Sequence, residues 1–543
     1  MLRSPVSAAR FLPLLLALGA TTCWAVEGKD DGQDDLDQAI EAKVAARSMR
    51  DLNSVITLCE SALDKGLSEK SQGFAKQLLA SSLVERGSAI CEMIFARNTP
   101  PAQWQQMRQI GLADLERALQ FDSALADAHL LVARLQTLPG GDRKRALTAI
   151  NELVRLSAEE PAKQAEALVL RSSLQEVPEK GLADLDDAVK LTPQDPKPLR
   201  TRGALKLSLK DVDGAVADFN AALALEPDDA STHEAKALTL ASQQKWDEAR
   251  ASLDRALELA PDSIEVLLQR GRVNVLDGKN DAGLADFSAA LKIDPENVPA
   301  LLLRAEAEIP DHLEEALEDL SKALDLRPGL VPALRQRAAL LAHLKKFTAA
   351  ESDLQLARKL EPTDHVASLQ LAAVYVVAGR TADALAIYDE VLQADAKHWM
   401  AYRGRGDLYL TNGRQRDAIA DFEKALELKD DDSGVLNNLA WVLATSPDES
   451  IRDGKRAIEL AKRACEVTDY KQPHILSTLA AGYAEIGDFT TAVEWSTKAL
   501  ELGDESQKAE LAKELESYQA SKPWRELQTA AADSAKPADS TRR

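Results

Sequence analysis

A short motif that recurs about every 34 residues limits the possible folds of this chain more than any other feature. The pattern Ala-Leu-x-Leu-x-Pro, or a close variant of it, ends at six successive prolines: Pro193, Pro227, Pro261, Pro295, Pro328 and Pro362. The same register continues with Ala396 and Asp430 in the proline position. A period held over this length predicts an array of repeats that pack on their neighbours. The 543 residues also exceed what a single compact core usually organises.

Each repeat has the pattern of two amphipathic helices. Between residues 196 and 229, Ala215, Phe219 and Ala222 share one helical face, and Pro227 ends the second helix. Apolar residues make up 45% of the chain but aromatic residues only 4%, and alanine and leucine favour helices. An all-α fold is predicted.

Two positions of the repeat carry small residues throughout, as close helix crossings require. The first position holds Gly203, Ala237, Gly271, Ala305, Ala338, Ala372 and Gly406. The second holds Ala215, Ala249, Gly283, Ala316, Ala350, Ala384 and Ala418.

The sequence resembles the tetratricopeptide repeat (TPR) family, whose unit of 34 residues carries Gly, Tyr, Ala, Phe and Pro at fixed offsets. Residues 399–430 place Gly406, Tyr409, Ala418, Phe422 and Ala425 at those offsets. The resemblance implies a right-handed superhelical α-solenoid of about 13 helix pairs with a C-terminal capping helix. The block 436–464 resembles a subtype of exported bacterial TPR proteins.

The resemblance and the local composition together divide the chain. We expect an acidic disordered linker over 26–34, divergent repeats over 35–180 and a regular array over 181–504. A capping helix is predicted within 505–526, where Trp524 folds back on the last repeat, and a disordered tail over 527–543.

The N-terminus has the features of a secretory signal peptide over residues 1–25. Arg3 and Arg10 precede an apolar run from Phe11 to Ala20, and small residues favour cleavage after Ala25. Lipidation at Cys23 is the alternative. The apolar run is too short to span a bilayer, and the rest of the sequence contains no apolar run long enough to do so. We therefore expect a periplasmic or secreted protein without a membrane span.

Charge and cysteine content restrict the partners further. The formal net charge of −22 disfavours nucleic acid, because an acidic surface repels the phosphate backbone. Cys59, Cys91 and Cys465 are expected to be small buried apolar residues, with a Cys59–Cys91 disulfide as the alternative in an oxidising compartment.

Catalytic motifs are absent from the sequence. It contains no phosphate-binding loop, no dinucleotide fingerprint, no His-Glu-x-x-His and no nucleophile elbow, and no two of its seven histidines are spaced i, i+4. We therefore predict a protein that is not an enzyme, with no catalytic residues, cofactor or metal site.

Charged residues nevertheless recur in register. Arg202, Arg270, Arg304, Arg337 and Arg405 share one position with Lys236, where the family usually has leucine, and a second position holds Asp184, Asp218, Asp286, Asp319, Asp353 and Asp421. One interpretation is a ladder of Arg–Asp pairs between helices. The other is that the arginines contact a ligand.

The resemblance also implies a binding face, because the first helices of TPR units line a concave groove. Its stripe falls on Arg200, Glu234, Leu268, Arg272, Leu302, Arg335, Leu369, Arg403, Asp407, Asn437 and Trp441. This mixed surface suits an extended or helical peptide with apolar and acidic groups. Asn437 and Asn438 resemble part of a carboxylate clamp, but its basic partners are missing.

The sequence thus predicts an exported scaffold or adaptor that binds a protein or peptide, in envelope or secreted-complex assembly. A cell-wall or carbohydrate adaptor and an accessory subunit of an enzyme complex are the alternatives. The identity of the partner and the oligomeric state are left open.

Overall fold

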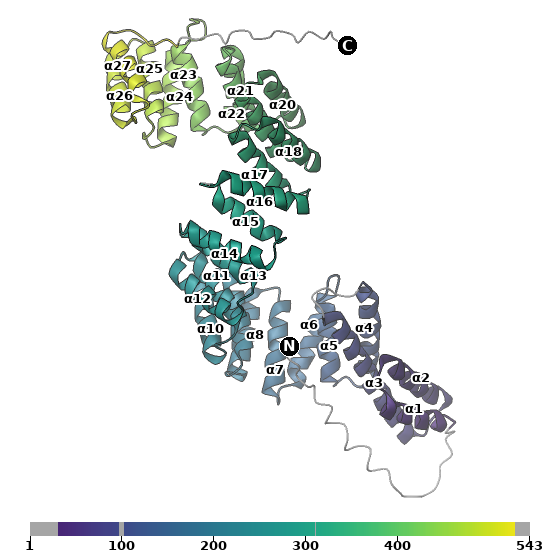
Figure 1. Ribbon diagram of the computed structural model, residues 1–543. Coiled ribbons are helices and arrows are strands. Elements are labelled where there is room, and N and C mark those ends of the chain that lie inside the picture. The colour runs from purple at the N-terminus through teal and green to yellow at the C-terminus, as the bar shows by residue number, and fades with distance from the viewer. Residues whose placement is uncertain (1–30, 97–101, 310, 527–543) are drawn as a thin grey trace, which may run out of the picture. The chain divides into compact units, whose positions relative to one another are not determined.

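The computed structural model describes residues 31–96, 102–309 and 311–526 (Figure 1). In these ranges the chain forms 27 α-helices and no strand. The predicted signal peptide, Cys23, most of the linker and the tail over 527–543 lie outside them.

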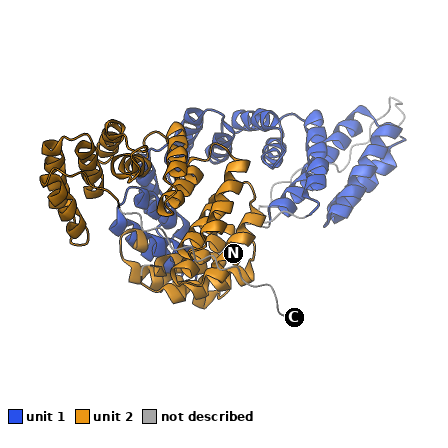
Figure 2. Cartoon of the chain, turned by 90° about the horizontal axis from the view of Figure 1, so that it is seen from above, with its two compact units in different colours: residues 1–273 blue, residues 274–543 orange. Residues whose placement is uncertain are grey.

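The helices fall into two compact units, residues up to Val273 and residues from Asn274 (Figure 2). The helices of the first unit are α1(Gln33–Ala45), α2(Met49–Lys65), α3(Glu69–Phe95), α4(Trp104–Phe121), α5(Ala126–Gln136), α6(Arg143–Leu156), α7(Pro161–Leu174), α8(Pro178–Leu191), α9(Pro196–Ser208), α10(Val212–Leu225), α11(Ala230–Ser242) and α12(Trp246–Leu259). Helix α13(Ile264–Leu276) contains the boundary.

The helices that follow are α14(Asn280–Ile293), α15(Val298–Glu308), α16(Leu313–Leu326), α17(Val331–His343), α18(Phe347–Leu360), α19(Val366–Val377), α20(Thr381–Ala394), α21(Trp399–Thr411), α22(Gln415–Leu428), α23(Ser433–Thr445), α24(Gly454–Val467), α25(Pro473–Glu485), α26(Phe489–Leu502) and α27(Lys508–Gln519). Helix α1 begins at Gln33, so the last two residues of the predicted linker are helical, a shift within the usual uncertainty of helix ends.

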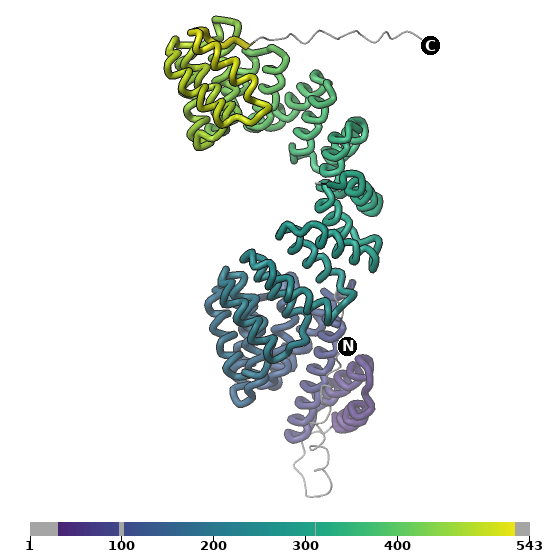
Figure 3. Tube along the Cα trace, turned by 60° about the vertical axis from the view of Figure 1, so that its left-hand side comes forward, coloured from purple at the N-terminus to yellow at the C-terminus, as the bar shows by residue number. Residues whose placement is uncertain are grey.

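Consecutive helices pack as pairs within each unit (Figure 3). The first unit contains the pairs from α1–α2 to α11–α12, and the second contains those from α15–α16 to α25–α26. Helix α13, which contains the boundary, and helix α14 continue the same order along the chain, and α27 packs on α26 and α25. The all-α array of about 13 pairs with a closing helix is therefore confirmed, and the handedness of the superhelix stays a prediction.

The turn inside many of the pairs places one residue in the left-handed backbone region, which favours glycine. Gly278, Gly379 and Gly413 take this conformation, with φ between 72° and 76°. At the same repeat position Lys210, Gln244 and Lys345 take it with φ between 57° and 65°. The 34-residue period is thus visible in the backbone even where glycine is absent.

Small residues are buried where the two helices of a pair cross, as predicted. A Cβ added at Gly203 would lie 2.9 Å from the Phe219 ring, and one added at Gly406 would lie 2.8 Å from Phe422. Where the repeat has leucine at the phenylalanine position, the small residue is alanine, as in Ala305 with Leu320 and Ala338 with Leu354. Glycine at Gly203 and Gly406 therefore leaves room for the larger ring, although the α19–α20 pair combines Ala372 with Tyr388.

Cys59, Cys91 and Cys465 are free and buried. Burial raises the pKa of the Cys59 thiol to about 12 and the pKa values of the Cys91 and Cys465 thiols to about 11. The interpretation of these residues as small packing groups is confirmed, and the Cys59–Cys91 disulfide does not form in this structure.

Candidate peptide-binding face

The arginines that recur in register form a ladder with the recurring aspartates. In unit 1, Nε and Nη2 of Arg202 donate to the two oxygens of Asp218 at 2.9 and 2.6 Å. In unit 2 the same two-bond pairing joins Arg304 to Asp319, Arg337 to Asp353 and Arg405 to Asp421 at 2.6–2.7 Å. These aspartate side chains are only 6–8% exposed.

The third nitrogen of each guanidinium reaches the preceding repeat. Nη1 of Arg202 donates to Asp186 at 2.7 Å, and Nη1 of Arg405 donates to Asp389 at 2.5 Å. Each arginine therefore joins the second helix of its own pair to the second helix of the pair before. This confirms the structural interpretation, because these guanidinium groups are already engaged within the protein.

Sequence reasoning missed part of this ladder. Arg86–Asp114 and Arg171–Asp184 make the same two-bond pairs in the divergent N-terminal repeats. Between α19 and α20 the two positions hold Leu371 and Ile387, both buried. An apolar pair thus replaces the ion pair in one repeat.

The predicted stripe in unit 1 is only partly accessible. Arg200 is half-buried, and its Nη1 donates to Glu226 at 2.8 Å and to Asp229 at 2.6 Å. Glu234 is half-buried, and burial, with a smaller contribution from Glu265, raises the pKa of its carboxyl group. Leu268 is 6% exposed and belongs to the core, so it cannot line a groove, whereas Arg272 is exposed.

In unit 2 the stripe alternates between apolar and charged residues. Leu302 and Leu369 are half-buried and pack on the core. Nη1 of Arg335 lies 3.6 Å from Asp364, and Nη1 of Arg403 donates to Asp432 at 3.0 Å. Their side chains keep 30% and 43% of their surface exposed.

These contacts form a second register that sequence reasoning missed. Arg200–Asp229, Arg335–Asp364 and Arg403–Asp432 are each separated by 29 residues. The three aspartates lie at the start of the next first helix, where a carboxylate accepts backbone N–H groups. The spacing is visible in the sequence, so it was an available signal.

A polar cluster lies where α21 meets α23. Nδ2 of Asn438 donates to Asp407 at 2.9 Å, and Nδ2 of Asn437 lies 3.4 Å from Oδ1 of Asn438. Nε of Arg403 lies 3.9 Å from Asp407, and burial raises the pKa of the Asp407 carboxyl group. Oδ1 of Asn437 is buried and accepts no hydrogen bond from the part of the chain that is described.

Trp441 lies one helical turn beyond Asn437, and the C-terminal part of the chain contacts its side chain. Its Nε1 donates to Oε2 of Glu526 at 2.7 Å. Glu526 lies 85 residues further along the chain, after the closing helix α27. The C-terminal segment therefore reaches the predicted stripe.

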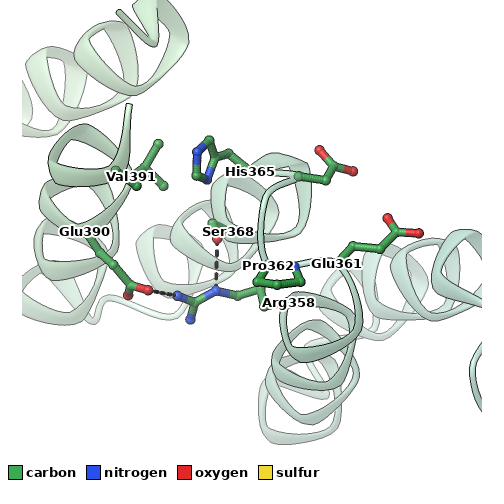
Figure 4. Close-up of a pocket in the computed structure, with 9 residues that line it drawn as sticks. Arg358, Glu361, Pro362, His365, Ser368, Glu390 and Val391 are labelled. Atoms are coloured by element: carbon green, nitrogen blue, oxygen red, sulfur yellow. Dashed lines mark hydrogen bonds and ion pairs between the residues drawn. The ribbon is translucent and has the colours of Figure 1, made fainter. Parts of the chain in front are cut away.

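A small cleft of about 110 Å³ between α18, α19 and α20 is a junction between repeats (Figure 4). Nε of Arg358 donates to Ser368 at 2.9 Å and its Nη2 donates to Glu390 at 2.6 Å, as the dashed lines show. These Arg358 donors are therefore already engaged within the protein.

Within residues 31–96, 102–309 and 311–526, no group of three or more His, Cys, Asp or Glu side chains is placed to hold a metal ion. No helix in those ranges combines the length and the apolar character of a membrane span.

Comparisons with known proteins identify the repeat. The tetratricopeptide repeat family matches residues 200–264 and 369–433. Sperm-associated antigen 1 of Rattus norvegicus is 42% identical over 71 residues, which cover 13% of this chain and 8% of that protein. DnaJ homolog subfamily C member 3 of Gallus gallus is 35% identical over 63 residues, which cover 12% of each chain. This chain thus matches only a small part of either relative.

Solved structures with the same kind of fold include yeast Tom70, at 13% identity and a TM-score of 0.39, over 90% of this chain and 96% of that one. YrrB, described as a TPR protein with an unusual peptide-binding site, aligns at 18% identity and a TM-score of 0.29 over 34% of this chain and 95% of its own.

Paired helices, small residues at their crossings and a 34-residue register define a helical-repeat protein. More particularly, the chain carries tetratricopeptide repeats over residues 200–264 and 369–433.

Proposed function

We propose that this protein is a non-catalytic scaffold whose first-helix face in unit 2 binds an extended segment of another protein. The observation that carries the proposal is the cluster of Arg403, Asp407, Asn437 and Asn438. It combines a half-exposed cation with a buried carbonyl oxygen, on Asn437, that lacks a donor. A buried acceptor without a partner costs free energy that a ligand's N–H group would recover.

The chemistry of the stripe indicates the kind of segment that would bind. Arg335 and Arg403 make single or long contacts with their own aspartates, so a carboxylate on the partner offers each a further charge-assisted bond. Leu302 and Leu369 add half-buried apolar surface to the same stripe. An extended segment with alternating acidic and apolar side chains fits this pattern.

The location of the protein is part of the proposal. The leader over 1–25 supports export to the periplasm or beyond, and so a role in assembling envelope or secreted complexes. Edman sequencing of the protein purified from its own cells tests this. A first residue at Val26 supports cleavage after Ala25, and an intact Met1 with cytosolic fractionation contradicts export.

A crosslinking pull-down from the envelope fraction, read by mass spectrometry, tests the binding face. The Arg335→Glu/Arg403→Glu double variant is expected to lose the enriched protein, because it reverses two charges of the stripe. The matched control is Arg414→Glu/Arg416→Glu, which makes the same charge change beside the α21–α22 turn, where both arginines are more than half exposed. Equal capture by the two variants would refute the assignment of the face.

The two tryptophans that a carbohydrate adaptor would use, Trp399 and Trp441, are both engaged within the protein. The indole nitrogen of Trp441 is bonded to Glu526, and the ring of Trp399 is covered by Lys429 with the ammonium 4.7 Å from the ring centre. Neither ring is an open platform for a sugar.

A further inference from the structure

After the closing helix and the turn at Ser521, residues 522–526 cross back over the last repeats, and we call these five residues the C-terminal strap. Ser521 has φ of 53°, and the N–H of Lys522 donates to Ser517 O at 2.9 Å. This turn ends α27 and reverses the chain. Pro523 follows, which favours an extended path.

The strap is held at each of its last three residues. Trp524 packs on the apolar cluster of the final repeats, as the sequence predicts. Nη2 of Arg525 donates to Oε2 of Glu485 at 2.5 Å, and its Nη1 lies 3.3 Å from Ala444 O. The N–H of Glu526 donates to Thr445 O at 3.1 Å, while its carboxylate accepts the Trp441 indole N–H.

The strap contacts the repeats in the way that a bound peptide would. An extended segment gives main-chain and side-chain bonds to the ends of two adjacent first helices, α23 and α25. Glu485, at the end of α25, is 14% exposed and shares its second oxygen with Arg452 at 2.8 Å. One residue that the strap contacts, Trp441 of the first helix α23, is also a residue that the repeat register assigns to the binding stripe.

We propose that the strap occupies one end of the partner-binding face, and that the partner's segment displaces it with the same chemistry: an aromatic residue followed by a basic and an acidic one. This inference deepens the proposed peptide-binding function and rests on it. The aromatic side chain enters the place of Trp524, the cation pairs with Glu485 and the carboxylate accepts the Trp441 N–H.

Tethering sets how strongly the strap competes. A short flexible linker holds a segment at an effective concentration on the order of millimolar. If the free segment binds with a Kd of ~0.1 mM, the intact chain binds an added copy about tenfold more weakly than an opened chain does. The strap therefore competes with ligands, and only those that bind more tightly than the strap can displace it.

Fluorescence anisotropy with a labelled peptide of residues 519–526 (QASKPWRE) tests the inference. The proteins compared are the full chain and the full-length Trp524→Ala/Arg525→Glu variant, which loses the strap's apolar contact and its ion pair with Glu485. The opened variant is expected to bind the peptide at least about tenfold more tightly than the full chain. A peptide carrying the same two substitutions is the control and should bind neither protein.

Two further measurements make the result decisive. Circular dichroism must show equal helicity in the two proteins, and Glu485→Gln in the opened variant should weaken peptide binding. Equal affinity of both proteins for the peptide, or binding to neither, overturns the inference. If that happens while the Arg335/Arg403 variant still loses the partner in the pull-down, the proposed function stands and only the role of the strap is wrong.

Discussion

At the scale of single residues, the repeats act as controls for one another. Where one pair of helices has glycine opposite phenylalanine, others have alanine opposite leucine, and where several have an Arg–Asp pair, one has leucine and isoleucine. The effect of a substitution in one repeat can therefore be compared with another repeat of the same chain that already has the substituted residues.

Gly406→Ala is expected to lower the local stability of the α21–α22 pair by about 1–2 kcal/mol, because the new Cβ would lie 2.8 Å from Phe422. Combining it with Phe422→Leu should recover part of the loss, since Ala338 with Leu354 is such a pair. Hydrogen exchange of α21 and α22 measures both. Strict additivity of the two single substitutions would contradict steric coupling.

Asp353→Ala is expected to cost about 3–5 kcal/mol, because it leaves the Arg337 guanidinium partly buried without its carboxylate. The double variant Arg337→Leu/Asp353→Ile copies the Leu371–Ile387 pair and should lie within about 1 kcal/mol of the parent protein. Local unfolding free energies from hydrogen exchange of α17 and α18 compare them. A double variant as unstable as the single one would show that the ion pair has no apolar equivalent at this position.

At the scale of elements, the closing helix α27 carries the least expected group, a buried carboxyl. Glu514 is 4% exposed, accepts a hydrogen bond from the Ser477 hydroxyl of α25 and lies near the fully buried Tyr518. Burial raises the pKa of Glu514 from 4.5 to about 7. The folded state therefore holds a proton that the unfolded chain releases above its lower pKa.

The sign of the pH effect follows from this difference. Between about pH 4.5 and 7 the folded state binds more protons, so the docking of α27 weakens as the pH rises, by up to about 3 kcal/mol. Glu514→Gln cannot ionise and should match the parent protein at pH 5 but hold α27 more firmly at pH 8. Hydrogen exchange of α25 and α27 at the two pH values measures this. Equal loss of protection in both proteins would exclude Glu514 as the cause.

At the scale of the whole molecule, the period predicted the fold well and the exposure of the stripe residues less well. The helix pairs, the small crossings and the Arg–Asp ladder follow from residues that recur in register, because each repeat meets the same local packing problem. Leu268 was assigned to the stripe by register alone, and its burial depends on neighbouring side chains that vary. The hydrogen bond that Trp441 donates to Glu526 of the strap joins residues 85 apart in the sequence. This separation does not recur between repeats, so no repeat pattern could reveal the bond.

The order of the repeats also predicts which helices a destabilising substitution should affect. Helices contact mainly their neighbours in sequence, so stability adds locally along each unit. Arg86→Ala leaves Asp114, 8% exposed, without its bidentate partner and should raise hydrogen exchange in α3, α4 and the adjoining pairs. The helices from α21 to α26 should keep their protection. Arg405→Ala is the reciprocal variant, with exchange raised around α21 and α22 and unchanged from α1 to α4. Loss of protection along the entire chain in either variant would mean that the array opens as one cooperative body, against the local contacts that the structure shows.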